Sequence, residues 1–446
     1  MTDDMERTNR LVAAGRSAGR RLWDSPRETT VGELLAELAA PDPDEPADVY
    51  GDGVVARLEQ RVAELLGTEE AAFFPSGTMA QQIALRCWAG RTGNPVVALH
   101  PMSHPELWEG GALSVVSGLR TVHPTREPRQ PTAEEVAELA EPFGTLMLEL
   151  PLRDAGFLLP SWEELEELVG AARERDAVVH FDGARLWEAA PHLGRTLPEI
   201  AALADSVYVS FYKSLGGLSG AALAGPSALI AEARVWRHRY GGQVFRQFPQ
   251  ALSALAGLER ELPRLPSYVA HARVVAQGLR EGFLTAGTPW FRIHPEVPHT
   301  HQFQVWLPYG ADRLTEAGIR LAEETGTVLF RSWEPAPVPG LAVTEVTVAE
   351  PGLAWTGRDA AEAVAAFLAR LQPAPGPVPG SPGPQPGPQP GQQPRPSRGR
   401  PPKGGDATRR AGRDAPSSAE VADQGARRGY RPTTGSTSPS IGGETP

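Results

Sequence analysis

The sequence predicts an α/β protein with a mainly parallel central sheet, helices on both faces of that sheet, and a smaller C-terminal α+β domain. Two observations support this fold class. Between residues 46 and 285, short apolar runs alternate with helical periods, which is typical of a parallel sheet covered by helices. After about residue 286, shorter strands and helices follow in mixed order. We therefore expect an N-terminal arm over 1–45, a large domain over 46–285 and a small domain over 286–372.

The large domain begins with a helix and a strand–turn–helix unit. Residues 54–67 (VVARLEQRVAELLG) place their apolar side chains on one helical face and end in Gly67, a common residue at helix ends. The run AAFF over 71–74 predicts a short strand. The turn PSGT then leads into a helix over 79–89.

The next predicted elements alternate in the same way. TLMLEL over 145–150 predicts a buried strand, and a helix over 161–175 opens with Ser161 and Glu164 at capping-box spacing. AVVHF (177–181) and SVYVSF (206–211) again predict strands. In the small domain we expect the strands QFQVWL, TVLF and AVTEVTV and the helices DRLTEAGIRLAEE and RDAAEAVAAFLARL.

Composition changes abruptly at about Pro373. Pro, Gly, Gln and Ser at the density of the following segment cannot bury a core, so we expect residues 373–446 to be a disordered tail. This tail is a candidate for binding an acidic or SH3-like partner, but a solvated extension is the simpler interpretation.

Charge, cysteine content and hydropathy exclude several classes of protein. The net charge of −11 argues against nucleic-acid binding by the folded body, and a single cysteine, Cys87, is typical of a reducing compartment. No signal peptide and no membrane-spanning run is evident. We expect a cytoplasmic protein without membrane or nucleic-acid partners.

One lysine stands out because the chain contains only two, Lys213 and Lys403. Lys403 lies in the predicted tail, so Lys213 is the only lysine of the predicted folded body. Arginine cannot replace lysine where a neutral, nucleophilic amine is needed, since its guanidinium stays protonated. Lys213 therefore predicts covalent chemistry, with an ordinary surface lysine as the alternative.

Three polar clusters follow predicted strands, where open α/β sheets place their ligands. Ser76, Gly77 and Thr78 lie at a strand-to-helix turn that could hold a phosphate, although such turns are often plain helix caps. Asp182 follows the predicted strand AVVHF, and Lys213 follows the predicted strand SVYVSF. A phosphate cradle, a carboxylate and an amine at neighbouring strand ends are the groups that pyridoxal 5′-phosphate requires. No metal site is predicted.

The sequence resembles the threonine aldolase and aromatic amino acid β-eliminating lyase family of fold type I pyridoxal-phosphate enzymes. The matching stretches occur in the family's order over about residues 50–250: YGDGVVARLEQRVAELLG, FFPSGTMAQQIAL, SHPELWEGGA, HFDGARLWEAAPHLG and SFYKSLGGLSGAALAG. The resemblance implies that Lys213 forms the Schiff base, Asp182 pairs with the pyridine nitrogen, and His104 stacks on the ring. It also implies that Gly77 and Thr78 bind the phosphate.

Two arginines take roles from the same resemblance. Arg185 would bind the substrate carboxylate, and Arg246 would reach the cofactor of a neighbouring subunit in a homodimer or homotetramer. The alternative for Arg185 is an ion pair with Glu188, three residues along the chain. We expect His180, Trp187 and Trp236 to be packing groups.

The substrate side departs from the family pattern. The serine of an N-terminal RSDT-like stretch has no clear match, and Leu152 stands where the family has a histidine. We expect Leu152 to make the wall near the β-substituent more apolar. No arginine stands near AVTEVTV, where a second carboxylate anchor is expected, so Arg292, Arg320 and Arg331 are candidates only by their domain.

The resemblance implies an enzyme that cleaves a β-hydroxy-α-amino acid to glycine and an aldehyde. Without the family histidine, His104 or a bound water would take the β-hydroxyl proton. The alternatives are β-elimination, transamination or racemisation with the same cofactor, in which the Lys213 amine would remove the α-proton. A catalytically degenerate cofactor-binding protein that acts through its tail is a further alternative.

Overall fold

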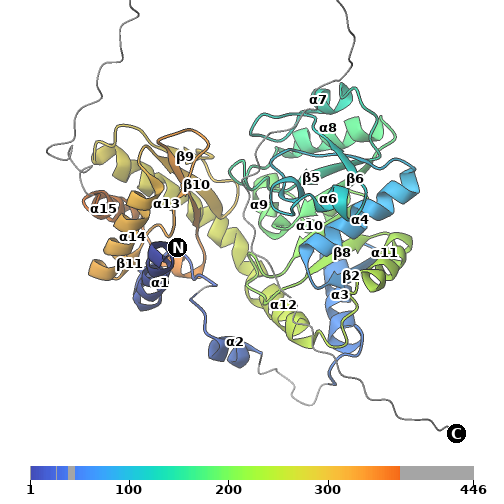
Figure 1. Ribbon diagram of the computed structural model, residues 1–446, viewed down its shortest axis with the longest axis horizontal. Coiled ribbons are helices and arrows are strands. Elements are labelled where there is room, and N and C mark those ends of the chain that lie inside the picture. Colours follow the sequence, from blue (N-terminus) through green and yellow to red (C-terminus); the bar gives the residue numbers. More distant parts are fainter. Residues whose placement is uncertain (1, 27, 39–45, 372–446) are drawn as a thin grey trace, which may run out of the picture. The chain divides into compact units, whose positions relative to one another are not determined.

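Seven strands form the central sheet of the computed structural model, in the order β2-β8-β7-β6-β5-β3-β4 (Figure 1). Their bounds are Glu70–Phe74 (β2), Val96–Ala98 (β3), Arg120–Val122 (β4), Thr145–Glu149 (β5), Val178–Gly183 (β6), Ser206–Ser210 (β7) and Ala221–Gly225 (β8). Strands β4, β3, β5, β6 and β7 run parallel, while β8 is antiparallel to both of its neighbours. The predicted α/β fold with a mainly parallel sheet is confirmed.

The structure describes residues 2–26, 28–38 and 46–371. The predicted tail over 373–446 lies outside the described residues. All the elements discussed below belong to one compact unit of the chain.

Helices cover both faces of the central sheet (Figure 1). The helices α3 (Gly53–Leu66), α8 (Trp162–Arg173) and α12 (Phe248–Arg260) pack on one face, and α4 (Gly77–Thr92) and α11 (Ser227–Arg239) on the other. Strand β2 shows why both faces are buried: Ala71 and Phe73 join the core beneath α3, and Ala72 and Phe74 join the core beneath α4. The short helices are α5 (His104–Leu107), α6 (Ala112–Val115), α7 (Ala133–Ala137), α9 (Ala190–Leu193) and α10 (Leu197–Ala201), with a 3₁₀ turn η1 (Leu186–Glu188).

Local sequence signals set the helix ends. Helix α3 ends at Gly67, whose φ of 65° lies in the left-handed region that glycine adopts without strain. Ser76 caps α4 by accepting a hydrogen bond of 3.3 Å from the Met79 amide, and the predicted capping box of Ser161 and Glu164 opens α8. The predicted turn at the start of α4 is therefore a true helix N-terminus.

The small domain contains a four-stranded antiparallel sheet in the order β12-β13-β10-β9. Its elements are β9 (Arg292–His294), β10 (Gln302–Leu307), β12 (Glu334–Pro335), β13 (Ala342–Thr347), α14 (Ala311–Thr325) and α15 (Gly357–Leu368). Helix α13 (Leu265–Thr285), the last element of the predicted large domain, begins in the core of that domain and continues into the core of the small domain. Phe303, Val305 and Leu307 pack against the three helices, so alternate residues of β10 point to the other face of this sheet. Of the predicted strand TVLF only Thr327–Val328 (β11) is extended, and it pairs with Arg20–Arg21 (β1).

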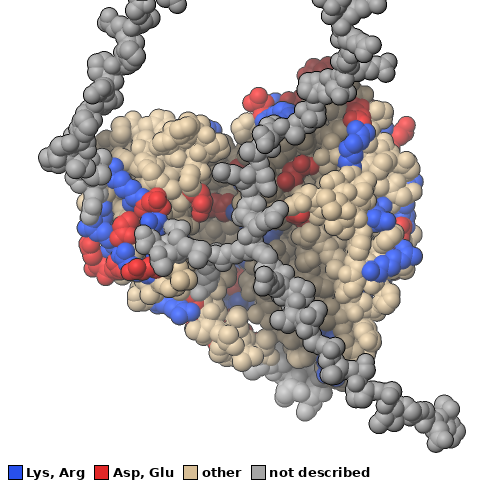
Figure 2. Space-filling view, viewed as in Figure 1, with Lys and Arg blue, Asp and Glu red and all other residues tan. Residues whose placement is uncertain are grey.

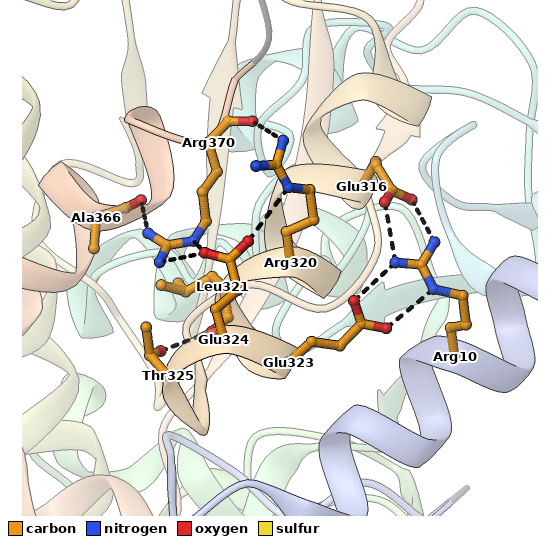
Figure 3. Close-up of polar contacts among 9 residues, drawn as sticks. All are labelled: Arg10, Glu316, Arg320, Leu321, Glu323, Glu324, Thr325, Ala366 and Arg370. Carbon is orange, nitrogen blue, oxygen red and sulfur yellow. Dashed lines mark hydrogen bonds and ion pairs between the residues drawn. The ribbon is translucent and has the colours of Figure 1, made fainter.

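The first helix, α1 (Thr2–Ser17), lies along α14 of the small domain (Figure 3). Arg10 reaches two glutamates of α14, with ion-pair distances of 3.1 Å to Glu316 and 2.9 Å to Glu323. Basic and acidic side chains are interspersed on this side of the molecule, at the left of Figure 2. Such exposed pairs each contribute at most about 1 kcal/mol. Ala14 and Ala18 add a small apolar contact with Ala322 and Val328. A second short helix, α2 (Val31–Glu37), follows it.

Within the described residues no helix combines the length and the apolar character that crossing a membrane would need.

Candidate active site

A cavity of about 1280 Å³ lies between the loops at the strand ends of the large domain and the open face of the small-domain sheet. The large domain contributes Arg185 and the segment Tyr212–Ser214 to its lining. The small domain contributes Gln302, Gln304 and Trp306, which are the residues of β10 that point away from the core. The cavity is therefore bounded by residues from both domains.

Lys213 lies in this cavity, three residues beyond the end of β7. Within the described ranges no carboxylate forms an ion pair with its amine, which lies 5.9 Å from the ring centroid of Tyr212. Burial and the nearby charge of Arg185 lower the pKa of Lys213 to about 8. This amine is therefore neutral, and hence nucleophilic, in a larger fraction of molecules near neutral pH than an ordinary lysine would be.

Two carboxylates lie side by side at the ends of β5 and β6, where Glu149 and Asp182 are paired in register. Asp182 is 2% exposed and accepts a hydrogen bond of 3.1 Å from the Ala184 amide. Burial raises the pKa of Asp182, and the charges of Lys213 and His104 oppose this shift. Burial and the charge of Asp182 also raise the pKa of Glu149 to about 7. A cationic partner would therefore stabilise the buried carboxylate form of Asp182.

Glu149 fixes the backbone of two neighbouring loops. Its carboxylate accepts hydrogen bonds from the backbone amides of His104, at 2.7 Å, and Arg153, at 3.2 Å. Glu149 thereby holds the start of α5, and with it His104, next to the sheet edge. The structure brings His104 and Lys213 each close enough to Asp182 to influence the charge of its carboxylate.

The N-terminus of α4 lies at the same edge of the sheet. Gly77 is buried, and a Cβ atom there would collide with the phenol of Tyr208 on β7. The Ser76 hydroxyl caps the helix, while Thr78 is exposed. The first amides of α4 and the Thr78 hydroxyl are donors suited to an anion such as a phosphate.

Arg185 presents a guanidinium without an acidic partner among the residues that the structure describes. Its buried Nε has no hydrogen-bond acceptor, and the guanidinium carbon lies 5.4 Å from the centre of the Phe157 ring. The alternative of an ion pair with Glu188 is wrong, because Glu188 Oε1 instead accepts a hydrogen bond of 2.7 Å from Ser214 Oγ. Arg185 is thus free to bind an anion from the cavity.

This geometry agrees with a family model. The model of the beta-eliminating lyases matches residues 35–288, which include Asp182, Arg185 and Lys213 but not the small-domain wall of the cavity. The chain belongs to the beta-eliminating lyase family.

Individual relatives carry the names of threonine aldolases and of a racemase. Low-specificity L-threonine aldolase 1 of Arabidopsis thaliana is 28% identical over 296 residues, covering 64% of this chain and 80% of the relative. A solved structure from Listeria monocytogenes, described as an L-allo-threonine aldolase, is 34% identical with a TM-score of 0.74, covering 82% of this chain and all of that one. Alanine racemase TOXG of Cochliobolus carbonum is 34% identical, but over 44% of this chain and 52% of its own length.

Not every residue that the sequence pointed to lies at the cavity. Arg246 is exposed on the loop before α12, with its guanidinium over the ring of the adjacent Phe245, and it is not part of the cavity lining. His180 is fully buried, with ring nitrogens 2.6 Å from Gln81 Oε1 and 2.8 Å from Ser206 Oγ. Trp187 is also buried, and its indole donates to the Ser210 carbonyl.

The expectation that Leu152 lines the substrate wall is wrong. Leu152 is fully buried and forms an isolated bridge with Leu158. The next residue, Arg153, lines the cavity instead, where it pairs with Glu345 of β13 at 2.9 Å and lies 5.7 Å from the ring of Trp108. Neighbouring side chains of this loop point in opposite directions, so Leu152 faces the core and Arg153 faces the cavity. The sequence alone does not reveal which of the two faces the cavity.

The three candidates for a second carboxylate anchor differ in their surroundings. Arg331 lines the cavity but is paired with Glu28, and Arg320 pairs with Glu324. Arg292 lines the cavity and contacts His294. Sequence reasoning missed Arg153, Tyr212, Ser214 and His301 as cavity residues; for Tyr212 and Ser214, adjacency to Lys213 was the available signal.

Proposed function

We propose that this member of the beta-eliminating lyase family is a pyridoxal 5′-phosphate-dependent aldehyde-lyase that cleaves a β-hydroxy-α-amino acid to glycine and an aldehyde. The observation that carries the proposal is the pairing of an amine and a guanidinium, Lys213 and Arg185, in one cavity, each without an acidic partner in the described part of the chain. An amine of this kind suits a carbonyl cofactor, and an unpaired guanidinium suits a carboxylate.

The residues at the strand ends fit this cofactor by their chemistry. Lys213 would hold its aldehyde group, Gly77 and Thr78 at the start of α4 would hold its phosphate, and His104 would cover its ring. Asp182 would face the ring nitrogen, because a buried carboxylate whose pKa is raised gains most from a cationic partner. When bound, pyridoxal phosphate supplies an electron sink for the charge left at the substrate α-carbon.

The side chains of this protein bind the substrate and move its proton. Arg185 would bind the α-carboxylate through two parallel hydrogen bonds. His104 is the proposed base for the β-hydroxyl proton, either directly or through a water. Its Nδ1 lies 3.5 Å from Glu109 Oε1, a buried oxygen without a hydrogen-bond partner in the structure. A carboxylate on that side favours a hydrogen on Nδ1 and leaves Nε2 as the proton acceptor.

Racemisation of an amino acid is the second candidate, and the TOXG relative favours it. It requires a base for the α-proton, and the Lys213 amine with its pKa of about 8 could serve. β-Elimination and transamination would use the same base. In the non-enzymatic alternative, a degenerate cofactor-binding protein, Lys213 and Arg185 would have no chemical task.

A product screen separates these functions. The protein loaded with pyridoxal phosphate is incubated with a panel of amino acids, and glycine, aldehyde, ammonia, keto acid and enantiomeric excess are measured. We expect glycine and aldehyde in equal amounts from β-hydroxy amino acids. Ammonia with keto acid, a new enantiomer, or no product from any amino acid would contradict the proposal and support one of the alternatives.

We further propose a homodimer or homotetramer. Val49, Tyr50, Val244 and Phe245 are each between 42% and 53% exposed, and Tyr50 contacts Phe245 through a hydrogen bond and an edge-to-face ring contact. This apolar area beside Arg246 suits a subunit interface, from which Arg246 would reach a neighbouring cofactor. Sedimentation of the protein tests this. We assign the protein to the cytoplasm from its single cysteine, and we propose no nucleic-acid or membrane partner.

A further inference from the structure

Arg185 and Glu188 lie in one tight turn, yet they do not pair. The Glu188 amide donates to the Arg185 carbonyl at 3.3 Å, and residues three apart in such a turn are neighbours on one face. Arg185 points into the cavity, whereas Glu188 is fully buried and does not line it. Two opposite charges this close on the chain would attract each other unless something else held one of them.

Ser214 and His301 hold Glu188. Ser214 Oγ lies 2.7 Å from Glu188 Oε1, and His301 Nε2 lies 3.2 Å from Ser214 Oγ and 3.6 Å from Glu188 Oε1. These three side chains come from different parts of the fold: the turn after β6, the residue after Lys213, and the start of β10 in the small domain. Glu188 and His301 are buried, whereas Ser214 is half-buried, and both Ser214 and His301 lie at the cavity wall.

A chain of polar contacts runs from the Val348 carbonyl through His301 and Ser214 to Glu188. His301 Nδ1 lies 2.8 Å from the Val348 carbonyl, which can only accept, so Nδ1 carries a hydrogen. The short contact between Ser214 and Glu188 is typical of a hydroxyl donating to a carboxylate. Ser214 thus links the two other members of the cluster, with its oxygen 2.7 Å from Glu188 Oε1 and 3.2 Å from His301 Nε2.

The hold on Glu188 is partial. Glu188 Oε2 is buried and has no hydrogen-bond partner, so this carboxylate keeps an unsatisfied acceptor. Arg185 likewise has a buried Nε without an acceptor. Without its contacts to Ser214 and His301, the buried Glu188 side chain would have no partner, and the guanidinium three residues away would be the partner in reach.

We propose that His301 and Ser214 are positioning residues that keep Glu188 away from Arg185, so that the guanidinium stays available for a substrate carboxylate. The proposal rests on the proposed function of Arg185 as the carboxylate anchor. His301, a residue of the small domain, would thus influence amino-acid binding through Glu188, which does not line the cavity.

The test measures binding of glycine, the smallest amino acid, to the protein loaded with pyridoxal phosphate by titration of the cofactor absorbance. In His301→Gln, which keeps a side-chain donor and loses the imidazole ring, we expect the glycine Kd to rise about tenfold or more, as for the loss of one charge-assisted hydrogen bond between Arg185 and the carboxylate. In the double variant His301→Gln/Glu188→Gln the competing acid is gone, so the Kd returns to within about twofold of the wild type. Melting temperatures report whether each variant folds.

His271→Gln is the matched control, because His271 also contacts a backbone carbonyl, that of Trp355, through one ring nitrogen. Its glycine Kd should not change. An unchanged Kd in His301→Gln, or a double variant that stays as weak as the single one, would overturn the proposal. If His301→Gln does not fold, Glu188→Gln decides: an equal or tighter Kd supports the proposal, and a Kd about tenfold weaker refutes it.

The outcomes separate this inference from the proposed function. A wild-type protein that binds glycine but releases no aldehyde would refute the lyase reaction and leave the role of His301 to be decided by the same Kd values. An Arg185→Ala variant with an unchanged glycine Kd would remove the carboxylate anchor, and the inference with it.

Discussion

Replacing Arg185 by alanine should weaken amino-acid binding strongly, because the wild-type guanidinium has no acid partner to lose. An arginine that is held in an internal ion pair gives up part of that pair when it binds a ligand. Within the described chain Arg185 has no such pair, its Nε is buried without an acceptor, and Glu188 is engaged by Ser214. The full interaction with a carboxylate is therefore lost in the variant.

The magnitude follows from the number of hydrogen bonds. A guanidinium binds a carboxylate through two parallel charge-assisted bonds, each contributing about 1.5 kcal/mol or more. Their loss costs about 3 kcal/mol, which corresponds to a rise in KM of about 100-fold. If the anchor acts equally on substrate and transition state, kcat changes little. Arg185→Lys should not restore binding, because an ammonium lacks the planar two-pronged geometry.

Steady-state kinetics of aldehyde release test this prediction with wild type, Arg185→Ala and Arg185→Lys. Arg260→Ala is the matched control, since Arg260 also lines the cavity but is already paired with Glu261 at 2.7 Å. We expect a near-normal KM for this control. A KM in Arg185→Ala within about threefold of the wild type would refute the reasoning and transfer the anchor to another residue.

Three further predictions concern the cofactor, the pH range and the substrate. Asp182→Asn should keep pyridoxal phosphate, visible in its absorbance, but lose about 100-fold or more in kcat, because an amide cannot stabilise a cationic ring nitrogen by charge; near-normal turnover would make Asp182 a structural residue. The stacked rings of His192 and His299 lie 4.0 Å apart, and burial lowers the pKa of His299 to about 4 and that of His192 also. Between about pH 4 and 6.5 the unfolded chain therefore binds more protons than the folded chain, so the stabilisation by these two histidines is complete above about pH 6.5 and is lost as the pH falls toward 4. His299→Asn should reduce the change of melting temperature with pH in this window, and an unchanged pH dependence would contradict the assignment. Trp108 and Leu107 line the cavity with about half of each side chain exposed, so we expect phenylserine to be cleaved with a kcat/KM about tenfold above that of threonine, a ratio that Trp108→Ala should reduce; a preference for threonine in the wild type would argue against an aromatic-binding wall.

The fold could be predicted where local signals are strong. Helix α3 and its end at Gly67 follow from an apolar face and a terminal glycine, and the strands β5, β6 and β7 from β-branched and leucine-rich runs. Strand β8 gave no such signal, because its sequence AALAG has low strand propensity and is extended only through pairing with β2 and β7.

The site could be predicted in part, for a similar reason. Residues at strand ends, such as Asp182 and Lys213, follow from the order of the parallel strands. Contacts between domains do not: His301 meets Ser214 across 87 positions of the chain. An ion pair between Arg185 and Glu188 is the simplest local prediction, but Glu188 instead contacts Ser214 and His301, which are distant in sequence. The orientation of Leu152 and Arg153 depends on one loop, where a shift by one residue reverses which side chain faces the cavity.

The most direct test of the account is the position of the covalent link to the cofactor. The protein loaded with pyridoxal phosphate is reduced with borohydride, digested and mapped by mass spectrometry, with Lys213→Ala treated in parallel. The account predicts the label on Lys213 alone in the wild type, and neither label nor turnover in Lys213→Ala. A label on Lys403, no label at all, or turnover in the variant would contradict the proposal that Lys213 is the amine of a pyridoxal-phosphate enzyme.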